Sequence, residues 1–417
     1  MQHRIIVLGA GYTGAIAAGR LAKRLHREDV AITLVNAEPD FVERVRLHQL
    51  AVGQDLRPRP FGEMFAGTGV ELKLARVTGV DVDRKTVTVT EATPAEHAAE
   101  TSAEASVTEE LPYDTLVYAL GSGWDSRGVP GTAEHAHDIA GRPGALRLRE
   151  RLARLGAGGS VVVVGGGLTG LEAATEIAEA RPDLDVALAA RGDLGDWLSP
   201  KGRAHLRKTV DRLGITVHEQ AAVTAVEADR VTTADGRSVP AEVTVWTTGF
   251  AVHPIAGATA LEIADTGQIV VDRTMRSVSH PDVYAVGDAA MALGPGEKPL
   301  RMSCATGTPM AWQAADAIAA RLTGGKVPET PMRYFNQCVS LGRGDGLIQY
   351  VTADDRAVRS ALTGRLAAVY KELICKGAAW GVANPTIGIP TRRRHVLRPH
   401  PQPAPTPTST PATELPA

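Results

Sequence analysis

Residues 5–14 read Ile-Ile-Val-Leu-Gly-Ala-Gly-Tyr-Thr-Gly, and residues 161–170 read Val-Val-Val-Val-Gly-Gly-Gly-Leu-Thr-Gly. Each stretch is an apolar strand that runs into a glycine-rich turn and opens a helix, the Gly-x-Gly-x-x-Gly pattern of dinucleotide-binding βαβ units. The first glycine permits the tight turn, the second lets the backbone approach a pyrophosphate, and the third lets the helix pack against the strand. A single copy is weak evidence, whereas two copies in this context indicate two nucleotide sites. We therefore expect one fixed and one exchangeable cofactor, with hydride passing between them.

Length, charge and cysteine usage narrow the class of protein. A chain of 417 residues exceeds what one hydrophobic core usually organises, so we expect two or three domains. The net charge of −2 gives no electrostatic reason to expect nucleic acid as a partner. No apolar run approaches membrane-spanning length, and the N-terminus leads directly into a strand, so the expected location is cytoplasmic. The cysteines (Cys304, Cys338 and Cys375) are widely spaced and form no CxxC pair, which predicts no redox disulfide beside a cofactor.

The residues after the first glycine loop continue a βαβ unit. Residues 14–24 are expected to form its crossover helix, and residues 31–36 read as its second strand. The residue that ends this strand usually contacts the adenosine ribose and is usually acidic. Here it is Asn36, whose amide can still hydrogen-bond hydroxyl groups, and Glu38 is a nearby substitute.

Two further strand-and-turn motifs indicate what the first site holds. Residues 113–122 read as a strand entering a small-residue turn, and residues 283–290 as a strand ending in a Gly-Asp pair. With Trp-Thr-Thr-Gly-Phe at residues 246–250, the chain resembles the two-dinucleotide flavoprotein reductases (the pyridine nucleotide–disulfide oxidoreductase superfamily) over about residues 4–380. The resemblance implies FAD at the first site, with Asp288 on the ribityl chain. A helix cap or turn residue is the alternative role for Asp288.

The same resemblance implies the architecture. We expect an α/β fold with two doubly wound Rossmann-like nucleotide-binding domains, for FAD and NAD(P)H, and a small C-terminal α/β segment. The expected divisions are FAD-binding residues 1–140 and 251–325, NAD(P)H-binding residues 141–250, C-terminal residues 326–390, and a disordered Pro-rich tail at residues 391–417. An Ala/Glu/Thr-rich stretch, residues 91–110, is expected to be a mobile surface insertion.

A helix after the Gly-Asp pair is predicted to point at the flavin. Thr308 suits an N-cap and Pro309 the first helical position, followed by an apolar helical pattern over residues 311–322. In the family this helix directs its N-terminus at the flavin pyrimidine edge, where the helix dipole stabilises negative charge.

The second glycine loop is expected to bind NADPH in preference to NADH. An NADH site would place an acidic residue where Ala190 stands, to bind both ribose hydroxyls. Its absence removes repulsion against a 2′-phosphate, and Arg191 offers a guanidinium to pair with one. The alternative is a solvated Arg191 and a site indifferent to the phosphate.

Glu172 lies on the predicted helix of residues 168–180, and we place it in the first turn after the glycine loop. In type II NADH dehydrogenases the matching glutamate reaches toward nicotinamide and flavin, where a carboxylate could orient the carboxamide or relay a proton. The alternative is an acid that only complements the helix dipole.

The branch of the family is indicated by which residues are absent. Without a cysteine pair at either glycine loop, disulfide reductase and sulfide:quinone reductase chemistry is not expected. The chain looks like the type II NAD(P)H dehydrogenase branch, whose quinone signature has two glutamines. Gln313 retains the first, and Ala317 replaces the second. A quinone, a specialised metabolite, and a non-catalytic sensor role therefore all stay open, and Cys304 is either a small core residue or a thiol beside the flavin.

The C-terminal segment departs from that branch. Residues 335–341 and 347–351 read as strands around a glycine turn. Residues 365–377 read as a helix, which we expect to pack on its own domain rather than on lipid, so that membrane contact is weak or absent. One face of that helix carries its large apolar residues, namely Leu366, Val369, Tyr370, Leu373 and Ile374.

These inferences define a set of candidate site residues, with no metal ligands among them. A small-molecule electron acceptor is the expected partner, and a homodimer is left open. The candidates for chemistry are Glu172, Gln313 and Cys304. The candidates for cofactor binding are Gly9, Gly11, Tyr12, Thr13, Gly14, Asn36, Arg44, His48, Ala119, Gly121, Asp288, Thr308, Pro309, Met310, Gly165, Gly167, Gly170, Arg191 and Gly249.

Overall fold

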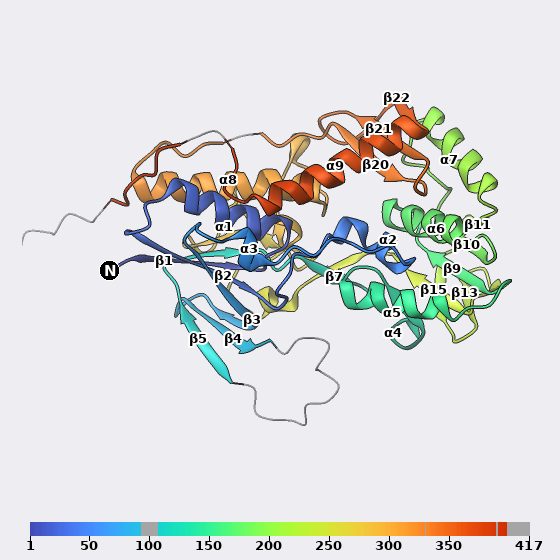
Figure 1. Cartoon of the computed structure of the whole chain (residues 1–417), viewed down its shortest axis with the longest axis horizontal. Coiled ribbons are helices and arrows are strands. Elements are labelled where there is room, and N and C mark those ends of the chain that lie inside the picture. Colours follow the sequence, from blue (N-terminus) through green and yellow to red (C-terminus); the bar gives the residue numbers. More distant parts are fainter. Residues whose placement is uncertain (93–106, 330, 389–390, 398–417) are drawn as a thin grey trace, which may run out of the picture.

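The computed structural model describes residues 1–92, 107–329, 331–388 and 391–397 (Figure 1). Most of the predicted insertion at residues 91–110 and most of the predicted tail at residues 391–417 lie outside the described residues. No helix in the described part of the chain is both long and apolar enough to cross a bilayer.

The first glycine loop belongs to a seven-stranded sheet in the order β18-β6-β1-β2-β3-β4-β5. The strands from β18 to β3 run parallel, and β4 and β5 are added antiparallel. Helix α1 packs on this sheet and α8 packs against α1 (Figure 1). The central strands β1 and β6 are buried and read as continuous apolar runs. The bounds are β1 His3–Leu8, α1 Tyr12–Arg24, β2 Val30–Asn36, β3 Val70–Asp81, β4 Thr86–Glu91, β5 Thr108–Pro112, β6 Thr115–Tyr118, β18 Val283–Ala285 and α8 Cys304–Thr323.

The second glycine loop belongs to a five-stranded parallel sheet in the order β11-β10-β9-β15-β8. Because β8 pairs with β15, this sheet begins before residue 141, where the sequence placed the domain boundary. The bounds are β8 Ala136–Asp138, α5 Arg142–Ala153, β9 Ser160–Val164, α6 Leu168–Ala180, β10 Asp185–Ala189, α7 Pro200–Arg212, β11 Thr216–His218 and β15 Val243–Trp246.

Short elements complete the two halves. An antiparallel pair, β7 with β16, runs between the two sheets, and a small three-stranded sheet is formed by β12, β13 and β14. Their bounds, with the remaining short helices and strands, are α2 Leu47–Ala51, α3 Phe61–Met64, β7 Ser122–Trp124, α4 Thr132–His135, β12 Val223–Val226, β13 Arg230–Thr233, β14 Ser238–Pro240, β16 Phe250–Val252, β17 Ile269–Val270 and β19 Ala290–Met291.

The C-terminal segment is a three-stranded antiparallel sheet followed by one long helix. The sheet comprises β20 (Asn336–Ser340), β21 (Gly346–Val351) and β22 (Ala357–Thr363), of which the sequence predicted the first two. It is fastened to the second domain through the buried Gln349, whose side-chain oxygen accepts from the backbone N–H of Ser199 at 3.0 Å.

The final helix, α9 (Arg365–Ala383), is longer than predicted, and the face that it buries is not the predicted one. Leu366, Val369 and Leu373 were expected to pack on the protein, yet they are 72, 58 and 63% exposed. The buried face instead carries small residues spaced by about one turn, together with Lys371, and these buried residues are Ala367, Cys375, Ala379 and Val382. The expectation was wrong because the position of β21, not residue size, decides which face of the helix is covered.

Candidate active site

A cavity of about 670 Å³ lies where the two nucleotide domains meet the C-terminal segment, and we call it the central cavity. Both glycine loops, the start of α8, and residues from β20 and α9 contribute to its walls. The sequence-derived candidates that line it are Gly9, Gly11, Tyr12, Thr13, Asn36, Arg44, His48, Ala119, Gly121, Gly167, Glu172, Asp288 and Cys304.

The first glycine loop has the form that a pyrophosphate requires. A Cβ on Gly9 would lie 2.5 Å from the Ala119 carbonyl oxygen, and one on Gly14 would lie 1.8 Å from the Gly9 carbonyl oxygen. Gly11 meets nothing within 4 Å, so its open side faces the cavity beside the first N–H groups of α1. Gly14 does not line the cavity, because its position serves the packing of the helix against the strand. The residues present fit a dinucleotide at this loop.

Asn36 does not offer a free amide to a ribose. Its side-chain oxygen accepts from the backbone N–H of Ala10 at 2.9 Å, and its side-chain nitrogen donates to the Glu38 carbonyl oxygen at 2.8 Å. Asn36 therefore ties β2 to the glycine loop, and the Glu38 carboxylate is the better candidate for the ribose hydroxyls.

Asp288 and Arg44 face the cavity from opposite elements of the first domain. The Asp288 carboxylate accepts from the Ser122 hydroxyl at 2.6 Å and lies 3.5 Å from Arg44. The Arg44 guanidinium also lies 5.2 Å from the centre of the Phe250 ring. Burial lowers the pKa of Arg44 against the opposing effect of Asp288. These contacts hold a carboxylate at the cavity wall. Asp288 lies within the short 3-10 turn Gly287–Ala289, whose N-cap is Val286, so its side chain does not cap that turn.

Helix α8 begins five residues before the predicted start, with Cys304 and not Pro309 as its first residue, so that prediction was wrong. Ser303 is the N-cap, and Pro309 lies inside the helix. The helix extends this far because Gly307 lets it approach the first glycine loop, where a Cβ would meet the Thr13 methyl at 2.5 Å. Thr308, Pro309 and Met310 are thus displaced from the cavity. The residues at this wall are instead Arg301, Met302, Ser303 and Cys304.

Gln313 also lies away from the central cavity. Its side-chain amide is buried on α8 and donates to the Pro328 carbonyl oxygen. The contact role that the sequence suggested for Gln313 is therefore not supported by its position.

The second glycine loop repeats the geometry of the first. A Cβ on Gly170 would lie 1.8 Å from the Gly165 carbonyl oxygen, whereas Gly167 is open and lines the cavity. Gly165, Gly170 and Gly249 shape the turn without lining the cavity. Arg191 is exposed just after β10, outside the central cavity, and Ala190 packs beneath the glycine loop.

Glu172 and Lys371 form a buried ion pair at the cavity wall. Glu172 is the fifth residue of α6, so it is not in the first turn as predicted, and complementing the helix dipole is no longer its main role. Its carboxylate lies 2.8 Å from the Lys371 Nζ and accepts from the Ser340 N–H at 3.0 Å. The pair joins the second nucleotide domain to the C-terminal segment.

The protonation states of this pair follow from its burial and its charges. Burial raises the pKa of Glu172, but the charges of Lys371 and His48 and the hydrogen bonds from Lys371 and the Ser340 N–H together leave a net lowering. Burial likewise lowers the pKa of Lys371, and the charge and hydrogen bond of Glu172, with the neighbouring thiols, together leave a net rise. His48 lies 3.9 Å from Glu172, and burial lowers its pKa to about 4, so its imidazole is neutral near neutral pH. The cavity wall therefore presents an ammonium, a carboxylate and a neutral imidazole.

Three thiols gather near this pair, although they are far apart in the sequence. Cys304 and Cys338 line the cavity from α8 and β20, and Cys375 follows Lys371 by one turn of α9. Burial raises the pKa of each thiol, that of Cys338 to about 11. The thiols are therefore protonated at neutral pH, which favours packing over nucleophilic chemistry.

Sequence reasoning missed Lys371 and Cys338 as site residues. Both come from the C-terminal segment, and only its folding against α6 brings them to the cavity. One available signal was Lys371 itself, on the last helix of the fold. A lysine is rarely buried unless it is paired, so a lysine that folding buries there needs a charged partner.

Comparisons with known proteins show the family of this chain. The family model described as pyridine nucleotide-disulphide oxidoreductase matches residues 3–319. The NADH dehydrogenase-like protein Rv1812c of Mycobacterium tuberculosis is 30% identical over 332 residues, covering 74% of this chain and 78% of that protein. The demethylphylloquinone reductase NdbB of Synechocystis is 26% identical over 392 residues, covering 89% of this chain and 92% of that protein.

Solved structures show the same fold. NDH2 from Plasmodium falciparum, in complex with NADH, superposes with a TM-score of 0.74 at 14% identity, covering 93% of this chain and 97% of that one. The sulfide:quinone oxidoreductase of Aquifex aeolicus has a TM-score of 0.74 at 20% identity and 92% coverage of both chains. The chain belongs to the pyridine nucleotide-disulphide oxidoreductase family, in its NADH dehydrogenase-like branch, and is an FAD-dependent NAD(P)H oxidoreductase.

Proposed function

We propose that this protein oxidises NADPH and reduces a quinone-like acceptor in the central cavity. The observation that carries the proposal is the buried Lys371–Glu172 pair at the cavity wall. FAD, when bound at the first glycine loop, accepts hydride and passes two electrons onward. Reduction of a quinone to a quinol takes two electrons and two protons; one proton arrives with the hydride, and the second must come from a side chain or solvent at the cavity wall.

Lys371 is placed to supply such a proton. Its ammonium lies at the cavity wall, and the adjacent Glu172 carboxylate keeps it charged in the resting protein. When Nζ gives up a proton, Glu172 and the neutral His48 are the neighbouring groups that can pass on a replacement. This arrangement serves an acceptor whose oxygens become hydroxyl groups.

Relatives support a quinone as the acceptor class. Among the curated relatives are a demethylphylloquinone reductase and a type II NADH:quinone oxidoreductase. A specialised metabolite with a reducible carbonyl is the second candidate, because Ala317 replaces one glutamine of the quinone signature and Gln313 lies away from the cavity.

The Ala190–Arg191 pair supports NADPH as the donor. Arg191 is exposed after β10, and no carboxylate among the described residues is paired with it. An engineered water-forming NADPH oxidase with this fold, bound to NADPH, carries substitutions of aspartate to alanine and alanine to arginine at adjacent positions. A small residue followed by arginine is what a 2′-phosphate requires, since the carboxylate that would repel it is gone.

A comparison of two acceptors tests the role of Lys371. In FAD-loaded Lys371→Met, turnover with a water-soluble quinone should fall by about 100-fold, because a positioned acid typically contributes that much or more. Turnover with ferricyanide, which takes electrons without protons, should fall much less. The double variant Glu172→Gln/Lys371→Met controls for the uncompensated carboxylate and should show the same selective loss. An equal loss with both acceptors would make Lys371 a structural partner and contradict the proposal.

A further inference from the structure

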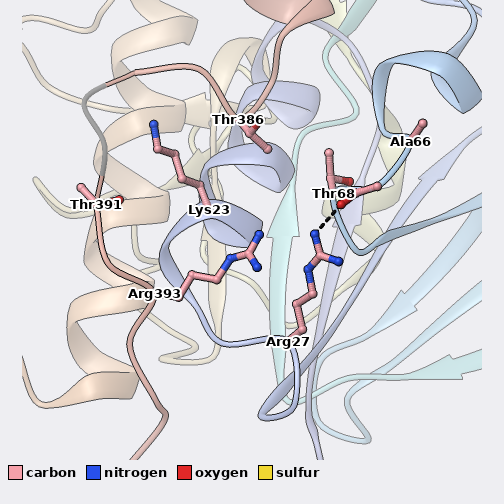
Figure 2. A pocket seen from close by; sticks show the side chains of 8 residues that line it. Lys23, Arg27, Ala66, Thr68, Thr386, Thr391 and Arg393 are labelled. Atoms are coloured by element: carbon pink, nitrogen blue, oxygen red, sulfur yellow. Dashed lines mark hydrogen bonds between the residues drawn. The ribbon is translucent and has the colours of Figure 1, made fainter.

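A second cavity, of about 430 Å³, lies at the opposite end of α1 from the glycine loop, and we call it the basic cavity (Figure 2). Helix α1 separates it from the central cavity by about 20 Å, at 1.5 Å per residue. The residues that line it are Lys23, Arg27, Ala66, Gly67, Thr68, Thr386, Thr391 and Arg393. No acidic residue is among them.

The walls of the basic cavity are held in place by backbone hydrogen bonds. The C-terminal segment runs beside the end of α1, where the Arg394 N–H donates to the Arg24 carbonyl oxygen at 2.9 Å. The His26 N–H in turn donates a hydrogen bond to the Arg394 carbonyl oxygen at 3.0 Å. The Val396 N–H then donates to the Asp29 carboxylate at 3.1 Å. The segment that carries Arg393 is therefore fastened on one side of the cavity.

Three cations of the basic cavity have no carboxylate partner among the described residues. Lys23 donates to the Gly388 carbonyl oxygen at 2.8 Å, Arg393 donates to the Ala22 carbonyl oxygen at 3.2 Å, and Arg27 donates to that of Gly67.

The carboxylates beside the end of α1 have other partners: Asp29 accepts from the Val396 N–H and lies 2.7 Å from the His395 Nδ1. Asp316 pairs with Arg20 at 2.6 Å and with Arg24 at 2.5 Å. Partial burial, and then Arg20 and Arg24, lower the pKa of Lys23, as expected where positive charge accumulates. The charge of the basic cavity is therefore not balanced by these contacts.

Basic residues at the C-terminal end of a helix can simply complement the helix dipole, but this role explains only some of the basic residues of the cavity. Lys23 and Arg24 lie in the last turn of α1, where they complement the helix dipole. Arg27 and Arg393 lie outside the helix, and Figure 2 shows the Arg393 side chain reaching toward Arg27, whose guanidinium is turned to the Gly67–Thr68 loop. Like charges that line one cavity repel, and an anion bound between them would turn this repulsion into charge-assisted contacts.

We propose that the basic cavity binds a phosphate-bearing anion, of the pyrophosphate or phosphate-ester class. Two guanidinium groups match phosphate oxygens in bidentate fashion, Lys23 adds a point charge, and the hydroxyl groups of Thr386 and Thr391 add neutral donors. A volume of about 430 Å³ exceeds that needed by one phosphate. Binding would join the C-terminal segment to α1, independently of the oxidoreductase chemistry.

Calorimetric titration of the FAD-loaded full chain with pyrophosphate tests this site. The buffer is free of phosphate and sulfate. We expect saturable binding. Arg27→Gln and Arg393→Gln should each weaken it about tenfold or more, since each removes a charge-assisted contact. Arg392→Gln, an exposed neighbour outside the cavity lining, is the matched control and should bind as the unaltered chain does.

Two further measurements separate the remaining outcomes. Without any anion, Arg393→Gln should leave the melting temperature unchanged or raise it, because repulsion is relieved. Vesicles containing phosphatidic acid, compared with phosphatidylcholine alone, show whether the phosphate belongs to a lipid headgroup. Binding to phosphatidic acid that is lost in Arg27→Gln supports the site with a lipid source. The proposal is overturned if neither probe binds, or if Arg27→Gln and Arg392→Gln bind equally well.

Discussion

At the scale of single residues, the Glu172–Lys371 contact makes the most definite prediction. Glu172→Gln should slow flavin reduction by NADPH about tenfold, or about 1.4 kcal/mol of barrier, if its carboxylate orients the nicotinamide. Because it leaves the buried Lys371 ammonium unpaired, it should also lower the free energy of unfolding by about 3 kcal/mol. Anaerobic rapid mixing measures the rate, and denaturant unfolding measures the stability.

The double variant Glu172→Gln/Lys371→Met separates these two effects. Removing both charges should restore much of the lost stability, because no buried charge is left unpaired. Flavin reduction should stay slow, and FAD occupancy should be intact in both variants. An unchanged rate in Glu172→Gln, with only the stability reduced, would leave Glu172 as a structural partner of Lys371.

Arg191 is the residue on which the proposed preference for NADPH depends. Arg191→Glu should shift the ratio of flavin-reduction efficiencies with NADPH and NADH toward NADH by about ten- to 100-fold, because one charge-assisted contact contributes about 1.5–3 kcal/mol. Lys208→Glu, on the exposed face of α7 in the same domain, makes the same charge change and should leave the ratio unaltered. A ratio that responds equally to both variants would show a general charge effect and remove the role assigned to Arg191.

At the scale of elements, the sequence predicts which segments form strands and crossover helices. It does not predict where a helix begins or ends, or which of its faces is buried. The strand–turn–helix units of both glycine loops form where predicted, because their apolar runs and glycines act locally. Helix α8 begins at Cys304 instead of near Thr308, since the Gly307–Thr13 contact joins residues distant in the chain. No local pattern carries that information.

Helix α9 gives an element-scale test of which face is covered. Leu373→Gln should change the free energy of unfolding by less than about 0.5 kcal/mol, because this side chain is exposed. Val382→Ala, on the fully buried face, should cost about 1–2 kcal/mol by opening a small cavity. Denaturant unfolding of the two variants compares them directly. A larger cost for Leu373→Gln would show that α9 is rotated toward the face predicted from the sequence.

At the scale of the whole molecule, function depends on three parts meeting at one cavity. The glycine motifs predict two nucleotide domains because each motif is complete within one βαβ unit. The third part, the C-terminal segment, contributes Cys338 and Lys371 through contacts with α6 that connect distant stretches of chain. A single sequence therefore reveals the cofactors more readily than the residues that meet the acceptor.

The central claim is that electrons pass from NADPH through bound FAD to a quinone-like acceptor. Sequential anaerobic mixing tests it most directly, with the flavin absorbance as the readout. We expect NADPH to bleach this absorbance faster than NADH does, and a second mixing with a short-chain quinone to restore it. Failure of both nicotinamides to bleach the absorbance would contradict electron transfer through FAD. Bleaching that no quinone reverses would contradict the acceptor.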